Sequence, residues 1–183
     1  NTWNQIGIDL YGEYQIYDNF YGFDVSLSFN GQRLAVGATG QVNLGGTNGR
    51  VYVYENLSLN SNWSQLGQNI NPFNSSGYSG SYVDFGSAVS LNHQGNIVSA
   101  SAPRANGENG EILTFQINNL NWNQIGLAIV GKNNYDRIGR EKCLSTSANG
   151  NKLVYGNIGS SNLLDINVFS LHLCSSYGCL DPV

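Results

Sequence analysis

Short stretches of alternating apolar and polar residues recur along the chain, and their order repeats three times. In Val25-Ser26-Leu27-Ser28 the apolar and polar side chains fall on opposite faces, with the period of a half-buried β-strand. Equivalent stretches begin at Val89 and at Leu144, and each is followed by a small apolar stretch and then by a β-branched, aromatic one. These later stretches are 34–38 and 51–54, 98–102 and 112–115, and 153–157 and 166–169.

Asn-Gly pairs separate these stretches. Asn30-Gly31 and Asn149-Gly150 follow the first stretch of their sets, and Asn48-Gly49 and Asn109-Gly110 precede the third. This dipeptide supplies the positive φ angles of tight hairpin turns. No long segment shows capped helical periodicity, so the sequence predicts antiparallel meanders.

A Trp-x-Gln-x-Gly segment completes the repeat and begins at Trp3, Trp63 and Trp122. We interpret these tryptophans as packing between neighbouring repeats, with sugar-stacking platforms as the alternative. The predicted fold class is all-β, with three repeats of a four-stranded antiparallel meander arranged as propeller-type blades. A β-trefoil or a β-prism is the alternative arrangement of the same strands.

We expect one β domain over residues 1–171, followed by a Cys-containing tail or the start of a further module over 172–183. The repeats cover approximately 3–62, 63–121 and 122–171. A single meander cannot bury both faces, so the repeats must stack. Propellers have about 4–8 blades, so three repeats imply a longer chain, combined copies or a different closure. The first Trp segment has no repeat before it and is predicted to complete the last one.

The repeat order carries a family resemblance. Tyr21-Gly22, Phe85-Gly86 and Ile138-Gly139 precede the first stretches, and Ala102-Pro103 ends a second stretch. This order resembles the FG-GAP-like, integrin-α-type β-propeller repeats of secreted surface proteins, over roughly residues 3 to 170. The Asp-x-Asp-x-Asp-Gly calcium loop of such blades is absent from the hairpins, so we expect no metal site.

The end of the chain shows a second resemblance. Tyr177-Gly178-Cys179-Leu180-Asp181-Pro182 is similar to the opening of a Gly-Cys-x-Asp-Pro module of secreted proteins. That resemblance implies that the chain is cut from a longer secreted protein. An ordinary C-terminal turn is the alternative.

The three cysteines are Cys143, Cys174 and Cys179. A Cys143–Cys174 disulfide would join the tail to the last repeat, and Cys174–Cys179 is the competing pair. Cys179 is then unpaired or bonded to a downstream partner. Three reduced thiols in a cytosolic protein are the alternative. His93 and His172 lack zinc-ligand spacing with these cysteines.

Asn56, Asn62 and Asn74 begin Asn-x-Ser triplets and are candidate glycosylation sites in a secreted chain. Tyrosines among Asn, Ser and Gly suit an adaptable contact surface. The candidate contact tyrosines are Tyr11, Tyr14, Tyr17, Tyr78 and Tyr82.

The composition of the chain and its lack of known motifs argue against several classes of function. Only 11% of the residues are charged and the net charge is −4, with eight basic residues, which argues against a nucleic-acid partner. No apolar run is long enough for membrane insertion. No Gly-x-Ser-x-Gly elbow is present, no cofactor motif is found, and we expect no catalytic residues.

These observations predict a non-enzymatic extracellular structural or adhesive module at the cell surface. It would assemble with copies of itself or with other extracellular proteins in a filament, sheath or appendage, because a surface of low charge permits close association. A carbohydrate-binding, lectin-like domain with glycan partners is the alternative, and an extracellular hydrolase is the third.

Overall fold

The computed structural model describes residues 2–12, 20–40, 49–58, 62–72, 83–157 and 166–170. Their secondary structure is almost entirely β, in three antiparallel sheets. Two short helical turns complete it, α1 (Ala105–Glu108) and the 3-10 turn η1 (Arg140–Lys142). The predicted all-β class with antiparallel sheets is therefore confirmed.

The first two sheets each contain a meander of four strands. The first sheet has the order β1 (Tyr21–Leu27), β2 (Arg33–Ala38), β3 (Arg50–Glu55), β4 (Ser64–Gln65). The middle sheet has the order β5 (Val89–Leu91), β6 (Ile97–Ala102), β7 (Glu111–Asn118), β8 (Asn121–Gln124), and β9 (Ile129–Val130) also pairs with β7.

The last sheet contains β10 (Leu144–Thr146), β11 (Lys152–Gly156) and β12 (Ile166–Ser170). With three described strands here and five in the middle sheet, three equal repeats of four strands are not confirmed. A fourth strand would have to pair with the edge strand β12, and the described part of the chain supplies none.

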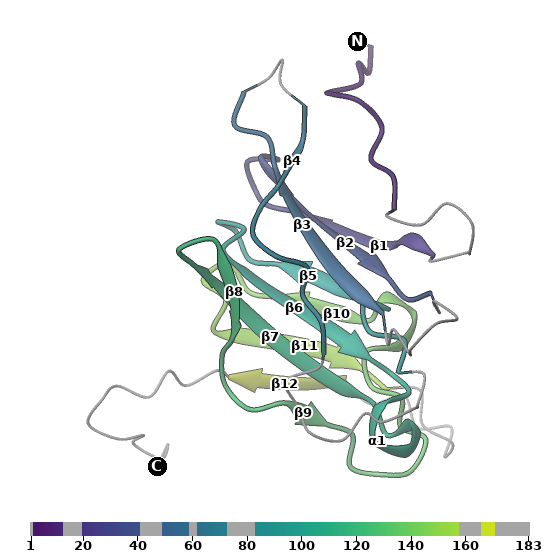
Figure 1. The fold of residues 1–183 in the computed structure, drawn as a ribbon. Helices are drawn as coiled ribbons and strands as arrows, with labels where there is room; N and C mark the ends of the chain where they lie inside the picture. The colour runs from purple at the N-terminus through teal and green to yellow at the C-terminus, as the bar shows by residue number, and fades with distance from the viewer. Residues whose placement is uncertain are drawn as a thin grey trace.

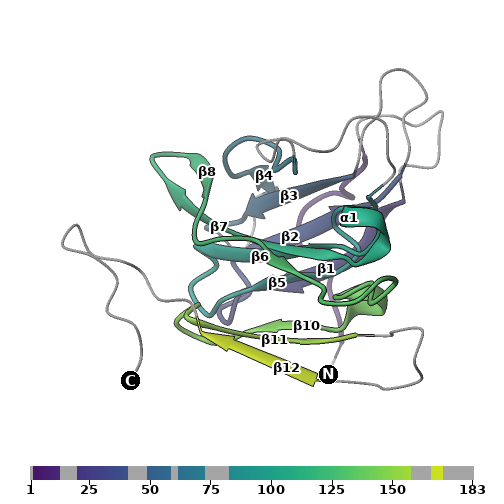
Figure 2. The same cartoon turned by 90° about the horizontal axis from the view of Figure 1, so that it is seen from below.

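The sheets lie on one another as layers, with the middle sheet between the first and the last (Figures 1 and 2). Strand β5 contacts both β1 and β10, so the leading strands of the three sheets are neighbours. All six residues of β6 are buried, because sheets cover both of its faces. Its sequence Ile-Val-Ser-Ala-Ser-Ala fits this position, since small side chains allow close approach.

Two apolar clusters fill the spaces between the layers. Between the first and middle sheets, Phe85 is fully buried and its ring meets Phe115 edge-on at 6.2 Å. Between the middle and last sheets, Ile112 and Ile138 pack with Leu153. Burial of these side chains is the main source of cohesion between the sheets.

A third apolar cluster lies on the outer face of the first sheet. Val36, Tyr52 and Tyr54 are buried there, and Leu10 and Trp63 partly cover them. The Tyr21 hydroxyl donates to the Tyr54 hydroxyl at 2.8 Å. Desolvation, followed by that hydrogen bond, raises the pKa of Tyr21 far above its usual value. The cluster itself is therefore covered, whereas Val25 and Leu27 on the same face of the sheet remain exposed.

Candidate functional site

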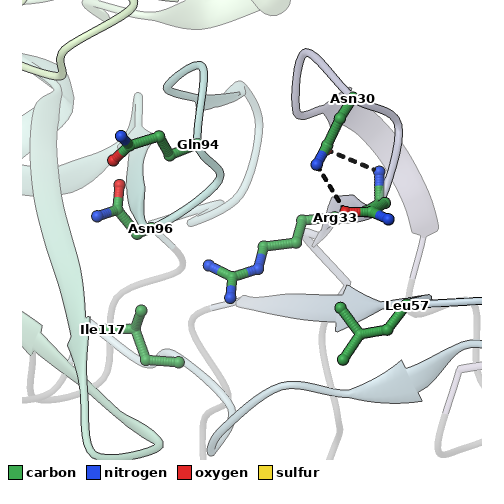
Figure 3. A pocket seen from close by; sticks show the side chains of 7 residues that line it. Asn30, Arg33, Leu57, Gln94, Asn96 and Ile117 are labelled. Atoms are coloured by element: carbon green, nitrogen blue, oxygen red, sulfur yellow. Dashed lines mark hydrogen bonds between the residues drawn. The ribbon is translucent and has the colours of Figure 1, made fainter.

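A polar pocket of about 430 Å³ opens between the first and middle sheets, beside their hairpin turns (Figure 3). Figure 3 shows Gln94 and Asn96 facing Asn30 and Arg33 across it, with Leu57 and Ile117 on the side of the strands. The described residues that line it are Asn30, Gln32, Arg33, Leu57, Gln94, Asn96 and Ile117.

The β1–β2 hairpin forms one wall. The Ser28 hydroxyl donates to the Asn30 side-chain oxygen at 2.8 Å, and the Gln32 backbone N–H donates to the same oxygen at 3.1 Å. The Asn30 amide donates in turn to the Gln32 side-chain oxygen at 2.7 Å. Asn favours this turn because its short side chain hydrogen-bonds nearby backbone, so the local sequence fixes this wall.

Arg33 reaches from the first sheet toward the middle sheet. Its guanidinium donates to the Gly95 carbonyl at 3.3 Å and lies 3.7 Å from the Glu55 carboxylate. A side chain at Gly95 would collide with the Arg33 chain, so glycine is needed at this position. Arg33 is therefore held in place from both sheets.

The β5–β6 turn forms the opposite wall. The Asn92 side-chain oxygen accepts from the backbone N–H groups of Asn96 and Ile97, both at 3.0 Å, and its amide donates to the Asn96 side-chain oxygen at 2.8 Å. Within the described chain, the side chain of Gln94 and the amide nitrogen of Asn96 have no hydrogen bond. Their hydrogen-bonding capacity is therefore unused within the described chain.

The lining determines what the pocket can do chemically. Side-chain amides and one guanidinium supply donors and acceptors, and two aliphatic side chains supply an apolar wall. Among the described lining residues there is no carboxylate, imidazole, thiol or hydroxyl. The pocket therefore suits recognition of a polar, hydroxyl-rich molecule. Sequence reasoning assigned Asn30 and Gln94 to hairpin turns and predicted no binding role for any residue of this lining. The one available signal was that these two hairpins occupy equivalent places in the repeat.

The three repeat tryptophans lie in different environments. Trp122 is buried and its indole N–H donates to the Leu66 carbonyl at 2.8 Å. Trp63 is half-buried against the outer cluster of the first sheet. Trp3 is fully exposed, at 102%, contrary to the predicted packing role. The physical reason is that its segment pairs with no described strand and so meets no neighbouring sheet.

The remaining predicted site residues fall inside and outside the described chain. Asn56 is buried, with its side-chain oxygen accepting from the Ser58 N–H at 3.2 Å, whereas Asn62 is exposed. Cys143 is exposed just before β10. The Tyr11 hydroxyl is exposed and donates to the Asp9 carboxylate at 3.1 Å.

Several predicted site residues lie outside the described ranges, and they are Tyr14, Tyr17, Asn74, Tyr78, Tyr82, Cys174 and Cys179. The Cys143–Cys174 disulfide therefore remains a prediction.

Glu111 is a buried carboxyl outside the pocket, at the start of β7, with 4% of its surface exposed. In the described chain the carboxyl group has one side-chain hydrogen bond, a long one of 3.4 Å from the Asn106 amide. Desolvation raises the pKa of Glu111 above its ordinary value of 4.5. The folded state therefore binds this proton more tightly than the unfolded state, and the contribution to stability falls as the pH rises above that value.

We therefore expect Glu111→Gln to raise the free energy of unfolding by about 1 kcal/mol near pH 7, because a buried charge is replaced by a neutral amide. The gain should disappear at about pH 3, where the carboxyl is protonated in both states. Urea titrations at the two pH values measure this difference. An equal gain at both would show that ionisation of Glu111 is not its cause.

The described residues contain no helix long and apolar enough to cross a membrane. No three His, Cys, Asp or Glu side chains among them gather to hold a metal ion.

No family model matches the chain and no curated protein matches it, so the FG-GAP-like and Gly-Cys-x-Asp-Pro resemblances remain predictions. Solved structures do match, and β-propeller folds are among them. TolB from Acinetobacter baumannii shares 16% identity over 80% of this chain and 29% of its own, with a TM-score of 0.43. A putative TolB from Agrobacterium tumefaciens shares 14% over 86% and 48%, with a TM-score of 0.45.

A third match corrects one expectation. A putative 6-phosphogluconolactonase from Bacteroides uniformis shares 16% identity over 80% of this chain and 40% of its own, with a TM-score of 0.45. The prediction that this chain is not an enzyme is therefore not maintained, because a protein described as a putative enzyme is among its structural neighbours. A likeness of this size assigns no reaction to the chain. The chain spans less than half the length of each of the three matched chains.

Proposed function

We propose that this protein is an extracellular structural or adhesive module that assembles with copies of itself or with matrix. The observation that carries the proposal is the apolar character of the two outer sheet faces. On the first sheet Val25 is 57% and Leu27 59% exposed, and on the last sheet Ile166 is 78% and Val168 68% exposed. We name these surfaces the head face and the tail face.

Contiguous exposed apolar residues of this kind mark interaction surfaces. Inside the stack, sheet faces of similar composition are covered by a neighbouring sheet. With only 11% of its residues charged, the chain offers little electrostatic opposition to such contacts. Secretion, a Cys143–Cys174 disulfide, glycosylation and the FG-GAP-like repeat all belong to this proposal.

Sedimentation and light scattering over a range of protein concentrations test the proposal. We expect the mean mass to rise above that of one chain as the concentration increases. The structural proposal fails if the chain remains a single copy at all concentrations and also does not bind an extracellular matrix preparation.

The polar pocket favours a second function, carbohydrate binding. Its amide groups and Arg33 could hydrogen-bond sugar hydroxyls while Leu57 and Ile117 contact the apolar ring face. We expect the protein to be retained on at least one column of a polysaccharide panel. Retention should fall about tenfold for Gln94→Ala and remain unchanged for Gln124→Ala, which alters an exposed glutamine of β8 outside the pocket. Equal loss in both variants, or no retention, would contradict this function.

A further inference from the structure

Neighbouring sheets are joined by hydrogen bonds that recur at the same repeat position. The Leu91 N–H of the middle sheet donates to the Ser26 hydroxyl of the first sheet at 3.0 Å. One layer further, the Thr146 N–H of the last sheet donates to the Ser90 hydroxyl of the middle sheet at 2.9 Å. In each case the serine of one sheet holds the backbone of the sheet that follows it in the chain.

A second bond recurs at the hairpin turns. The Phe29 N–H donates to the His93 carbonyl, and the His93 N–H donates to the Ala148 carbonyl, both at 3.1 Å. These three residues occupy equivalent positions in their repeats. The contacts between sheets are therefore directional, since each sheet has one set of groups for the sheet before it and another for the sheet after it.

The first sheet (the head) and the last sheet (the tail) carry the donors and acceptors that correspond to these bonds but have no described partner. At the tail, the Ser145 hydroxyl and the Ala148 N–H have no hydrogen bond within the described chain. At the head, the Ser28 N–H donates to the Arg33 carbonyl, so by alternation the Leu27 N–H points away from β2. The Phe29 carbonyl likewise has no described partner. The Ser145 hydroxyl is thus the acceptor that corresponds to a Leu27 N–H donor, as the Ser90 hydroxyl accepts from the Thr146 N–H. The Ala148 N–H is likewise the donor that corresponds to a Phe29 carbonyl acceptor.

Gly22 also indicates a missing neighbour. It occupies the same position in its repeat as Gly86 and Gly139, and all three have positive φ, at 82°, 91° and 70°. A side chain at Gly86 would collide with the Arg50 carbonyl oxygen of the preceding sheet, and one at Gly139 would collide with Ser101. A Cβ added at Gly22 would meet no atom of another described segment within 4 Å. The backbone at Gly22 therefore allows the close approach of a neighbouring sheet that Gly86 and Gly139 make, and the described residues provide no such neighbour.

A cavity that could hold the exposed Trp3 of another copy lies beside the last sheet. Trp122 packs on the Leu66-Gly67 segment that follows β4, where its indole N–H bonds the Leu66 carbonyl. The equivalent segment after β8 is Ile125-Gly126, and it lines an apolar cavity of about 520 Å³ together with Leu153 and Phe169. That cavity lies where the Trp of a fourth strand on β12 would pack.

We propose that copies of this chain associate head to tail, with the head face of one copy on the tail face of another. The N-terminal segment of the second copy adds to the edge of β12 of the first copy, and its Trp3 fills the cavity at Ile125-Gly126. We assign a second copy to this position because the same chain carries the donor of each recurring hydrogen bond at one end of the stack and its acceptor at the other. This inference rests on the proposed self-association and specifies its geometry. Because head and tail differ, such contacts form open filaments or closed rings.

The sharpest test blocks one face at a time. Val25 pairs with Val36 on the head face, and Val168 pairs with Val154 on the tail face. Both are exposed, so Val25→Glu and Val168→Glu should fold normally. Each variant alone should remain a single copy at concentrations where the unaltered chain associates. An equimolar mixture should form dimers and nothing larger, because the Val168→Glu copy keeps its head and the Val25→Glu copy keeps its tail.

Leu120→Glu is the matched control, since Leu120 in the β7–β8 turn has the same 68% exposure as Val168. It should associate like the unaltered chain. Trp3→Ala should weaken association about tenfold or more without changing the thermal unfolding of a dilute sample, because Trp3 is fully exposed in one copy. Thermal unfolding of all variants verifies that each is folded.

The outcomes separate the two proposals. If the unaltered chain associates but the face variants associate equally well, or if either variant alone still dimerises through like faces, the head-to-tail geometry is wrong and self-association stands. If the unaltered chain never associates, the self-assembly proposal fails and this inference fails with it. A non-reducing gel identifies any association that intermolecular disulfides produce, and such association counts against the proposed interface.

Discussion

Substitution of Phe85 by alanine is expected to lower the free energy of unfolding by about 3–5 kcal/mol, the usual cost of removing a buried aromatic ring. Phe85 is fully buried between the first and middle sheets, and its backbone forms a bridge with Gly49 of the first sheet. Because it is enclosed by both sheets, the loss should leave a cavity that neither can close. Urea unfolding followed by tryptophan fluorescence measures the change.

Phe29→Ala provides the matched control for Phe85→Ala. Phe29 is 79% exposed and stacks on His93 with ring centroids 4.2 Å apart. Removing an exposed ring of this kind should cost about 1 kcal/mol at most. Comparable losses in the two variants would mean that the cluster between the sheets does not dominate stability.

Alternation along the chain was enough to predict the strands, because burial of one sheet face imposes a period of two. The stretch beginning at Val25 lies within β1, and the Asn30-Gly31 turn connects β1 to β2 with the Gly31 N–H bonded to the Ser28 carbonyl at 2.9 Å. The sequence did not predict that β1 begins at Tyr21, before an irregularity in its pairing with β2. Such a bulge depends on how two strands fit, which one strand's pattern does not encode.

The Asn109-Gly110 position was predicted as a tight hairpin turn, and the structure has the helical turn α1 just before it. The Gly110 N–H bonds the Ala105 carbonyl at 3.1 Å, and Gly110 lies against Ile138 of the segment leading to the last sheet. The glycine is therefore needed for close contact between segments as well as for its φ of 83°. The turn preference of Asn-Gly predicts that the chain changes direction at Asn109-Gly110. The contact with the neighbouring segment determines which type of turn forms there.

The environments of Trp3 and of the polar pocket could not be obtained from the sequence for a related reason. Equivalent sequence around Trp3 and Trp122 predicts equivalent packing, but a strand forms only where a neighbouring strand offers its edge. Likewise Arg33 and Gln94 meet only because two sheets stack with their hairpins aligned. The sequence repeat predicts which residues occupy equivalent positions. Which of these residues contact another sheet depends on how the sheets are stacked.

Gly37 shows how closely the sheets approach, and we expect Gly37→Ala to lower the free energy of unfolding by about 3 kcal/mol or more. Gly37 lies in β2, opposite Val51 of β3, and faces the middle sheet. An added methyl group would fall inside the contact distance of the Gly86 carbonyl oxygen. Since that oxygen belongs to backbone, only separation of the two sheets could relieve the collision.

Gly31→Ala separates this steric effect from the cost of backbone conformation. Gly31 has a φ of 69°, and a Cβ added there would meet no atom of another described segment within 4 Å, so alanine meets conformational strain alone, at about 1–2 kcal/mol. Hydrogen exchange gives the decisive readout, because the Leu91 N–H is bonded to Ser26 across the interface. Gly37→Ala should accelerate exchange at Leu91 far more than Gly31→Ala does. Unchanged protection of Leu91 in Gly37→Ala would show that the two sheets do not depend on this close approach.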